Sequence, residues 1–247
     1  MTTVRAEDRA GGVRLLTLDR PPANAITVAL LADLAAALDA ARDDGAVRAV
    51  VLTGAGRFFS GGLDLRGGID FQAAIPGTGR ADPFSGFNTC MLNFLRFPKP
   101  TVAMVGGHAI AGGLILLLAC DFRLGLDADY RVGLNEVEVG ASFPKAAFEV
   151  ARLRLTHVQA SELLLGAAIY PASQAVRLGV VDELLPAEGF EAAVMSRAAR
   201  LGSFPRAAYA HTKLALTAGA VAAIEEGTPE EAIRTAAVWM TPESIEA

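Results

Sequence analysis

The stretch KPTVAMVGGHAIAGG, residues 99–113, decides the fold. Thr101 to Val105 is rich in β-branched residues and predicts a buried strand. The pair Gly112-Gly113 then leads into an apolar run that ends before Asp121. The whole apolar stretch, residues 109–120, is shorter than the roughly 20 residues that span a bilayer. We therefore expect a strand followed by a fully buried helix.

The same alternation of strand and helix continues toward the N-terminus. Residues 13–18 predict a strand that ends at Pro21-Pro22, and residues 48–53 predict a second strand. Between them, Thr27 can cap a helix that runs to about residue 43. The apolar residues of that helix recur at helical spacing, at Leu30, Leu31, Leu34, Leu38 and Ala41. Strand, helix and strand in this order predict an α/β fold.

Toward the C-terminus the pattern becomes mostly helical. A helix is expected at 84–96, and short strands at 121–126, 130–133 and 180–181. Further helices are expected at about 144–153, 156–165, 172–177, 187–201, 205–217 and 228–239. In residues 69–83 the apolar residues recur with neither helical nor strand spacing, and we predict a mobile loop there. We predict an α/β core over residues 1–186 and a helical section over 187–247, whose Ala-rich helices pack on their own core or on a partner subunit.

Composition narrows the classes of function. The 247 residues carry a formal net charge of −5 and no Lys/Arg run, which argues against nucleic acid as a partner. Two cysteines, Cys90 and Cys120, form neither a disulfide scaffold nor a metal framework. The N-terminal MTTVRAEDRA has no apolar segment, so we expect no signal peptide, no membrane association and a cytoplasmic location.

Two glycine-containing loops are candidate ligand sites. The first, GAGRFF at residues 54–59, fails the dinucleotide pattern because Phe59 stands where the third glycine belongs. The second is Gly112-Gly113, at the start of the predicted buried helix. Unpaired N–H groups at a helix N-terminus can stabilise a developing oxyanion. On spacing alone, close packing of helix on strand is the more frequent reason for such a glycine pair.

Four segments, in this order, resemble the crotonase (enoyl-CoA hydratase/isomerase) superfamily. They are PPANAIT at 21–27, FSGGLDL at 59–65, KPTVAMVGGHAIAGG at 99–113 and ASQAVRLGVVDELLP at 172–186. The resemblance implies a crotonase-like ββα spiral core followed by a C-terminal helical trimerisation section. It also implies a homotrimer or a hexamer built as a dimer of trimers, acting on an acyl-CoA thioester.

The resemblance assigns roles to particular residues. The backbone N–H groups of Leu63 and Gly112 would form the oxyanion hole for the thioester oxygen. Glu136 would be the catalytic acid/base. No metal and no separate cofactor is implied, since coenzyme A arrives as part of the substrate. The resemblance also implies that the following residues contact the substrate or coenzyme A: Ala23, Ala25, Ile26, Gly61, Asp64, Leu65 and Ile115.

The reaction depends on how many carboxylates face the substrate. Hydratases of this family use two glutamates, and Ile115 occupies the position of the first. The segment YRVGLNEVEVG, residues 130–140, is similar to the Δ3,Δ2-enoyl-CoA isomerases, in which a single glutamate moves the proton. We therefore expect an isomerase that moves a double bond from position 3 to 2-trans.

Two alternatives remain open. A hydratase, or another lyase or hydrolase of the superfamily, could use a second acid from Asp64, Glu138 or the 69–83 loop. In an extended segment Glu138 would share a face with Glu136. The other alternative is a non-catalytic acyl-CoA binder.

Overall fold

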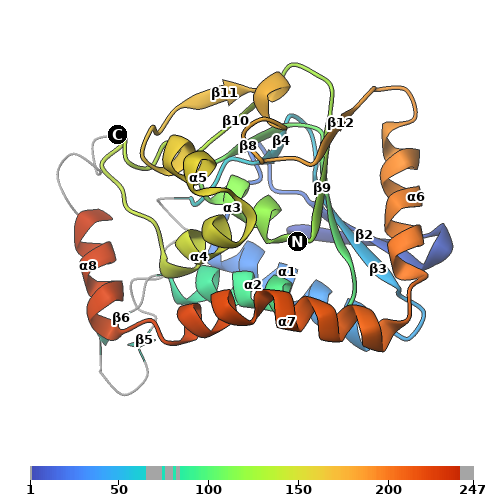
Figure 1. The fold of residues 1–247 in the computed structure, drawn as a ribbon, viewed down its shortest axis with the longest axis horizontal. Coiled ribbons are helices and arrows are strands. Elements are labelled where there is room, and N and C mark those ends of the chain that lie inside the picture. Colours follow the sequence, from blue (N-terminus) through green and yellow to red (C-terminus); the bar gives the residue numbers. More distant parts are fainter. Residues whose placement is uncertain (1, 65–73, 76–79, 82–83, 240–247) are drawn as a thin grey trace.

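A computed structural model describes residues 2–64, 74–75, 80–81 and 84–239. Its strands enter two sheets alternately as the chain advances (Figure 1). The first strand of each repeat joins a six-stranded sheet and the second joins a four-stranded sheet. A helix then closes the repeat. The three complete repeats are β3 (Ala49–Gly54), β4 (Phe58–Ser60) and α2 (Ser85–Arg96); β7 (Thr101–Val105), β8 (His108–Ile110) and α3 (Gly112–Ala119); and β9 (Phe122–Leu126), β10 (Arg131–Gly133) and α4 (Lys145–Arg154).

Both main sheets are parallel except at one edge. The six-stranded sheet has the order β1-β2-β3-β7-β9-β12, in which only β1 (Val4–Arg9) and β2 (Val13–Leu18) pair antiparallel. The four-stranded sheet has the order β11-β10-β8-β4, with β11 (Ile169–Pro171) antiparallel to β10. The remaining strands are β12 (Glu183–Leu185) and a small pair, β5 (Ala74–Ile75) with β6 (Arg80–Ala81).

Helices cover both faces of the six-stranded sheet. α1 (Val28–Asp43) begins where the Thr27 hydroxyl accepts from the Leu30 N–H at 3.1 Å, and it buries the predicted stripe against one face. Strand residues of opposite pleat, such as Leu15 and Val51, pack on α6 (Phe190–Gly202) at the other face. Figure 1 shows α6 beside β2 and β3, away from α1 and α2. This sheet is therefore buried on both sides, as parallel sheets require.

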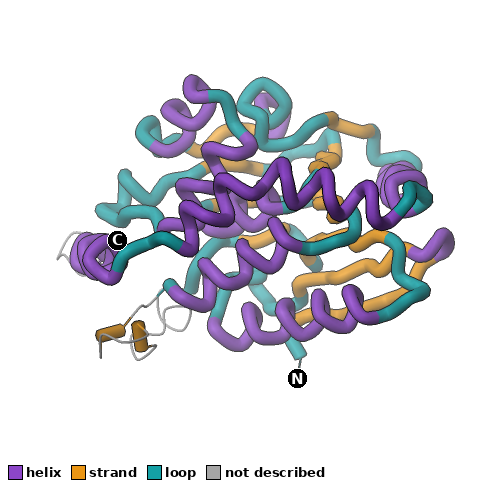
Figure 2. The backbone as a smooth tube through the Cα atoms, turned by 60° about the horizontal axis from the view of Figure 1, so that its bottom comes forward, coloured by secondary structure: helices purple, strands orange, loops and turns teal. Residues whose placement is uncertain are grey.

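The long helix α7 (Arg206–Glu225) lies across α2 and α4 (Figure 2). A buried ion pair ties it to the core, since Lys213 Nζ lies 2.8 Å from Asp121 Oδ2. Asp121 also accepts from the Tyr209 hydroxyl at 3.0 Å. Burial lowers the pKa of Lys213, and Asp121 opposes that shift. Because an unpaired buried charge is costly, this pairing fixes α7 against the start of β7, where Asp121 accepts from the Thr101 N–H at 3.0 Å.

Several expectations about local structure are corrected. Val180 and Val181 are buried but form no strand: their N–H groups both donate to the Ala175 carbonyl, closing a turn. The strand of this region is β12, three residues later. The helix expected at 172–177 is only a 3₁₀ turn over Ala172–Gln174. Most of the predicted mobile loop at 69–83 lies outside the described residues.

The other predicted helices are present, with shifted ends. α5 spans His157–Leu164 and α8 spans Pro229–Trp239. α7 continues eight residues beyond its predicted end at residue 217. No helix in the described ranges has both the length and the apolar character needed to cross a membrane.

Candidate active site

Three parallel strands of the four-stranded sheet end at one edge and carry the candidate residues there. β4 pairs with β8, and β8 pairs with β10, in parallel register. The segments that follow them are 61–64, Ala111-Gly112 and 134–136. Ligands of open α/β sheets bind beyond the carboxyl ends of the strands. The topology therefore brings Leu63, Gly112 and Glu136 to the same edge, although they are far apart in the sequence.

The loop that carries Leu63 is held by two buried polar residues that the sequence analysis did not single out. The Asn24 amide donates to the carbonyls of Ala55 and Phe58, at 2.9 and 2.8 Å. The Ser60 hydroxyl donates to the Asn24 carbonyl at 2.8 Å and accepts from the Gly62 N–H at 3.2 Å. Both residues lie in segments that carry the family resemblance, 21–27 and 59–65, but no local pattern predicts that the two side chains hold the same loop.

The loop that carries Leu63 and the turn at Gly112 touch. A Cβ built on Gly112 would lie 3.5 Å from the Leu63 nitrogen, and one built on Gly62 would lie 3.1 Å from the Gly112 nitrogen. On either side of Leu63, the Ile26 N–H donates a hydrogen bond to the Gly62 carbonyl, and the Asp64 N–H donates one to the Ile26 carbonyl. Within the described part of the chain, neither the Leu63 N–H nor the Gly112 N–H donates a hydrogen bond. Two neighbouring donors are thus left available for a ligand oxygen.

The backbone at Ala111 is strained in a way that shapes this pair of donors. Ala111 has φ 52° and ψ −134°, a conformation that non-glycine residues rarely adopt. Its own N–H donates to the Gly133 carbonyl at 2.9 Å, which fixes the turn against β10. The strain lies at the junction of β8 and α3, directly before the first N–H of the buried helix, and at this point the chain approaches the Leu63 loop.

Glu136 begins the turn that follows β10. Its side chain is buried, with 6% of the residue exposed, and its Oε2 has no hydrogen-bond partner among the described residues. Burial raises the pKa of Glu136 to about 7, and a hydrogen bond from its own backbone N–H opposes that shift. A carboxyl group whose pKa lies near neutral pH can both accept and return a proton. A buried acid with an unsatisfied oxygen is costly to keep, which marks it as a functional candidate.

The other candidate acids are placed differently. Asp64 is paired with Arg20, whose Nη2 lies 2.7 Å from Asp64 Oδ2. Glu138 is exposed, because residues 136–140 form a turn and not the extended segment that would have aligned it with Glu136. Ile115 is fully buried in α3. None of these positions offers a second buried, unpaired carboxylate.

The remaining predicted residues divide into two groups. Ala23, Ala25, Ile26 and Gly61 lie beside the Leu63 loop: Gly61 N donates to Ala23 O at 2.8 Å, and Ile26 bridges to Leu63. Leu65 lies outside the described residues. Among the residues with described positions, no group of three or more His, Cys, Asp or Glu side chains could hold a metal ion.

Comparisons with known proteins identify the family of this chain. A model of the enoyl-CoA hydratase/isomerase family matches residues 8–235. A putative enoyl-CoA hydratase of Thermus thermophilus is 36% identical over 71% of this chain and 69% of its own length. Two other curated relatives are matched over less than half of their own length.

Solved structures give the same result. An enoyl-CoA isomerase of Mycobacterium tuberculosis is 32% identical, with a TM-score of 0.80 over 96% of this chain and 98% of that one. Human mitochondrial Δ3-Δ2-enoyl-CoA isomerase, at 23% identity, shares the fold with a TM-score of 0.88 over 99% of this chain and 94% of its own. The chain therefore has the crotonase fold and belongs to the enoyl-CoA hydratase/isomerase family.

Proposed function

We propose that this enzyme moves the double bond of a 3-enoyl-CoA to the 2-trans position, with Glu136 as its single acid/base. The observation that carries the proposal is the Glu136 carboxyl group, which is buried, has a pKa of about 7 and finds no hydrogen-bond partner for Oε2 in the described part of the chain. It belongs to the same sheet edge as the two available N–H groups. Removing a proton next to a thioester needs both a base and charge stabilisation at the oxygen.

In the proposed mechanism the thioester oxygen sits between the N–H groups of Leu63 and Gly112. The Glu136 carboxylate takes a proton from C2, and the C–H electrons delocalise into a dienolate whose charge rests on that oxygen. The carboxyl group, now protonated, gives the proton to C4. The thioester carbonyl re-forms and the remaining double bond lies between C2 and C3. One group suffices because it removes the proton and returns it.

The surroundings of Glu136 favour this reaction over hydration. Hydration needs a second group to activate water, and Ile115 presents an apolar surface where a second glutamate would stand. Asp64 is already ion-paired and Glu138 faces solvent. Names among the relatives include both hydratases and an isomerase, so the reaction has to be decided on the chain itself.

The test is to incubate the enzyme with a 3-enoyl-CoA and, separately, with a trans-2-enoyl-CoA in deuterated water. We expect the 3-enoyl substrate to be converted to the 2-trans isomer without gain of water, as read by mass spectrometry. Rapid addition of water to the 2-enoyl substrate would instead identify a hydratase. Binding of both thioesters without turnover or deuterium uptake would leave a non-catalytic acyl-CoA binder.

The rate of isomerisation should depend on pH through Glu136. The carboxylate is the form that accepts the C2 proton, and its pKa in the free enzyme is about 7. We therefore expect kcat/KM to rise about ten-fold per pH unit below pH 7 and to level off above it. Circular dichroism at each pH controls for unfolding. A profile that stays flat between pH 5 and pH 8 would exclude a base with this pKa.

Three further parts of the proposal concern the whole protein. We propose that it assembles as a homotrimer or a dimer of trimers, acts in the cytoplasm and uses no cofactor beyond the coenzyme A of its substrate. Light scattering on the purified chain measures the assembly directly, and a monomer would contradict the proposed trimer.

A further inference from the structure

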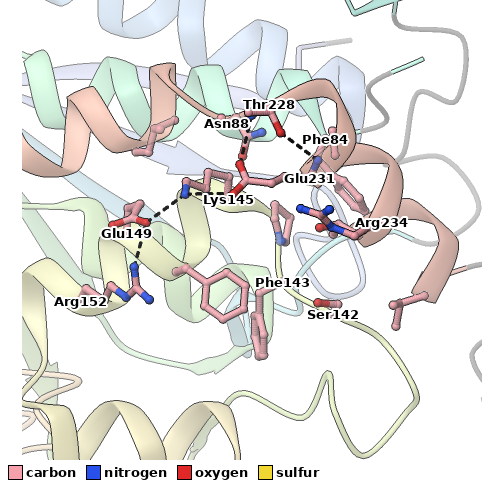
Figure 3. A pocket seen from close by; sticks show the side chains of 17 residues that line it. Phe84, Asn88, Ser142, Phe143, Lys145, Glu149, Arg152, Thr228, Glu231 and Arg234 are labelled. Atoms are coloured by element: carbon pink, nitrogen blue, oxygen red, sulfur yellow. Dashed lines mark hydrogen bonds and ion pairs between the residues drawn. The ribbon is translucent and has the colours of Figure 1, made fainter. Parts of the chain in front are cut away.

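A cavity of about 390 Å³ lies between α2, α4, the end of α7 and α8 (Figure 3). This volume falls in the range of roughly 300–1,000 Å³ that is typical of small-molecule sites. Phe84, Phe143, Phe148 and Ile224 give it an apolar lining. Charged side chains from α4 and α8 also line it. A cavity of this composition fits an apolar chain that ends in a polar group.

The cavity borders the elements of the candidate active site. Its wall at Ser142 and Phe143 follows directly on the Glu136 turn, where Ala141 N donates to Glu136 O at 2.8 Å. Another wall is formed by Asn88 of α2 and by Phe84, the residue that precedes this helix. The same helix places Phe87 Cε2 3.5 Å from a Cβ built on Gly112. An acyl chain bound with its thioester at Gly112 can thus extend between these walls.

Most charges at the cavity already have partners. Lys145 Nζ lies 3.6 Å from Glu149 and 3.8 Å from Glu231, and Arg152 lies 3.2 Å from Glu149. Arg234 differs, because it makes no ion pair or hydrogen bond with any residue that the structure describes. Figure 3 shows its side chain directed from α8 toward the side of the cavity where Phe143 and Ser142 lie. Among the described residues that line the cavity, Arg234 is therefore the charged side chain that has no ion pair.

Local hydrogen bonds cap the start of α8, and contacts at its end hold the helix against the segment that contains Ser142. At the start, Thr228 N donates to Glu231 Oε2 at 3.1 Å and Glu231 N donates to Thr228 Oγ1 at 3.2 Å. At the end, Trp239 Nε1 donates to the Ser142 carbonyl at 2.6 Å, and its ring lies 5.3 Å from that of Phe84. The helix is thus fastened to the wall that it faces.

We propose that the acyl group of the substrate carries a carboxylate at its far end, and that Arg234 binds this carboxylate. The inference rests on the proposed acyl-CoA site and names the class of thioester that the site prefers. A guanidinium group binds a carboxylate through two parallel hydrogen bonds, which gives direction as well as affinity. The apolar side chains around the cavity enclose the methylene groups, and the unpaired cation selects the charged end.

The experiment measures binding and needs no turnover. Octanoyl-CoA and the matching thioester of octanedioic acid are titrated calorimetrically into the wild type, Arg234→Gln and the control Arg177→Gln. Arg177 is exposed and contacts Gln174, far from the cavity lining. We expect Arg234→Gln to weaken the carboxylated thioester at least about ten-fold more than octanoyl-CoA, since a charge-assisted contact is lost. The ratio of the two dissociation constants should stay unchanged in Arg177→Gln.

The outcomes separate this inference from the proposed function. An unchanged ratio in Arg234→Gln, with both thioesters bound, overturns the carboxylate site and leaves the isomerase proposal standing. Failure of the wild type to bind either thioester overturns the acyl-CoA site and the inference together. Because the readout is a ratio within each variant, a general loss of folded protein cannot imitate the expected result.

Discussion

Glu136→Gln is expected to lower kcat for isomerisation by roughly 10⁴-fold, the upper end of what one acid/base group contributes. In the proposed mechanism the same carboxylate removes the proton from C2 and delivers it to C4. Glutamine keeps the shape of the side chain but can do neither. Steady-state kinetics with a 3-enoyl-CoA measure the loss, and uptake of solvent deuterium at C4 should disappear with it.

The same substitution should make the protein more stable at neutral and alkaline pH. The pKa of Glu136 is about 7 in the fold, against 4.5 as its ordinary value. The native state therefore holds a proton that the unfolded chain has released, so the free energy of unfolding falls as pH rises from 4.5 to 7. Glutamine does not ionise, so the free energy of unfolding of the variant does not fall in this way. The expected gain is about 3 kcal/mol at pH 8 and about 1 kcal/mol at pH 5.

Glu138→Gln is the matched control, because the residue is two positions away and exposed. It should keep wild-type kinetics and change the free energy of unfolding by less than about 0.5 kcal/mol. Urea denaturation at the two pH values gives the comparison. Equal loss of activity in both variants, or a Glu136→Gln protein that is destabilised at pH 8, would contradict the role assigned to Glu136.

Local patterns in the sequence predicted β2, β3, β7, β9 and β10 but missed β4 and β8, because 54–59 was expected to be a loop and 109–120 a single buried helix. The buried runs of β3, β7 and α3 were predicted because each is apolar and ends at glycine or a charged residue. β1 was missed, since VRAEDR is mostly charged and is held as a strand by antiparallel pairing with β2. Val180-Val181 was wrongly expected to be a strand, because a buried turn can be as apolar as a strand.

The site shows the same difference between what the sequence indicated and what depends on the packed fold. Resemblance to a family pointed to Leu63, Gly112 and Glu136, and the parallel strands do bring their segments to one edge. What makes Glu136 suited to its proposed role is the absence of a hydrogen-bond partner for Oε2 among the described residues. Such an absence is a property of the packed fold and has no local signal. The ion pair of Asp64 with Arg20 joins residues 44 positions apart, and no local pattern predicts it.

The glycine pair at 112–113 offers a second prediction with a large effect, because the two glycines have different reasons to be glycine. A Cβ on Gly113 would lie 2.3 Å from the Ser60 carbonyl oxygen, a clash with backbone, so this glycine is required for packing of α3 on β4. A Cβ on Gly112 would meet only ordinary contacts, at 3.5 Å from Leu63 N and from Phe87. The two explanations for the pair, close packing and an oxyanion site, thus apply to different residues.

Gly112→Ala should therefore fold but lose activity. Its methyl group would enter the space between the two N–H groups, where the thioester oxygen must come within about 2.7–3.1 Å of each donor. We expect kcat to fall by about 10²–10³-fold, the effect of losing one oxyanion donor. The free energy of unfolding should change by less than about 1 kcal/mol, since alanine favours helix over glycine by about that amount.

Gly219→Ala is the matched control, because Gly219 also lies in a helix and a Cβ there would meet nothing within 4 Å. Kinetics and thermal unfolding of the two variants separate an effect on the hole from a general effect of adding a methyl group to a helix. Wild-type kcat in Gly112→Ala would mean that the thioester oxygen binds elsewhere. Loss of activity with retained stability, seen at Gly112 and not at Gly219, would place the developing negative charge beside the first N–H of α3.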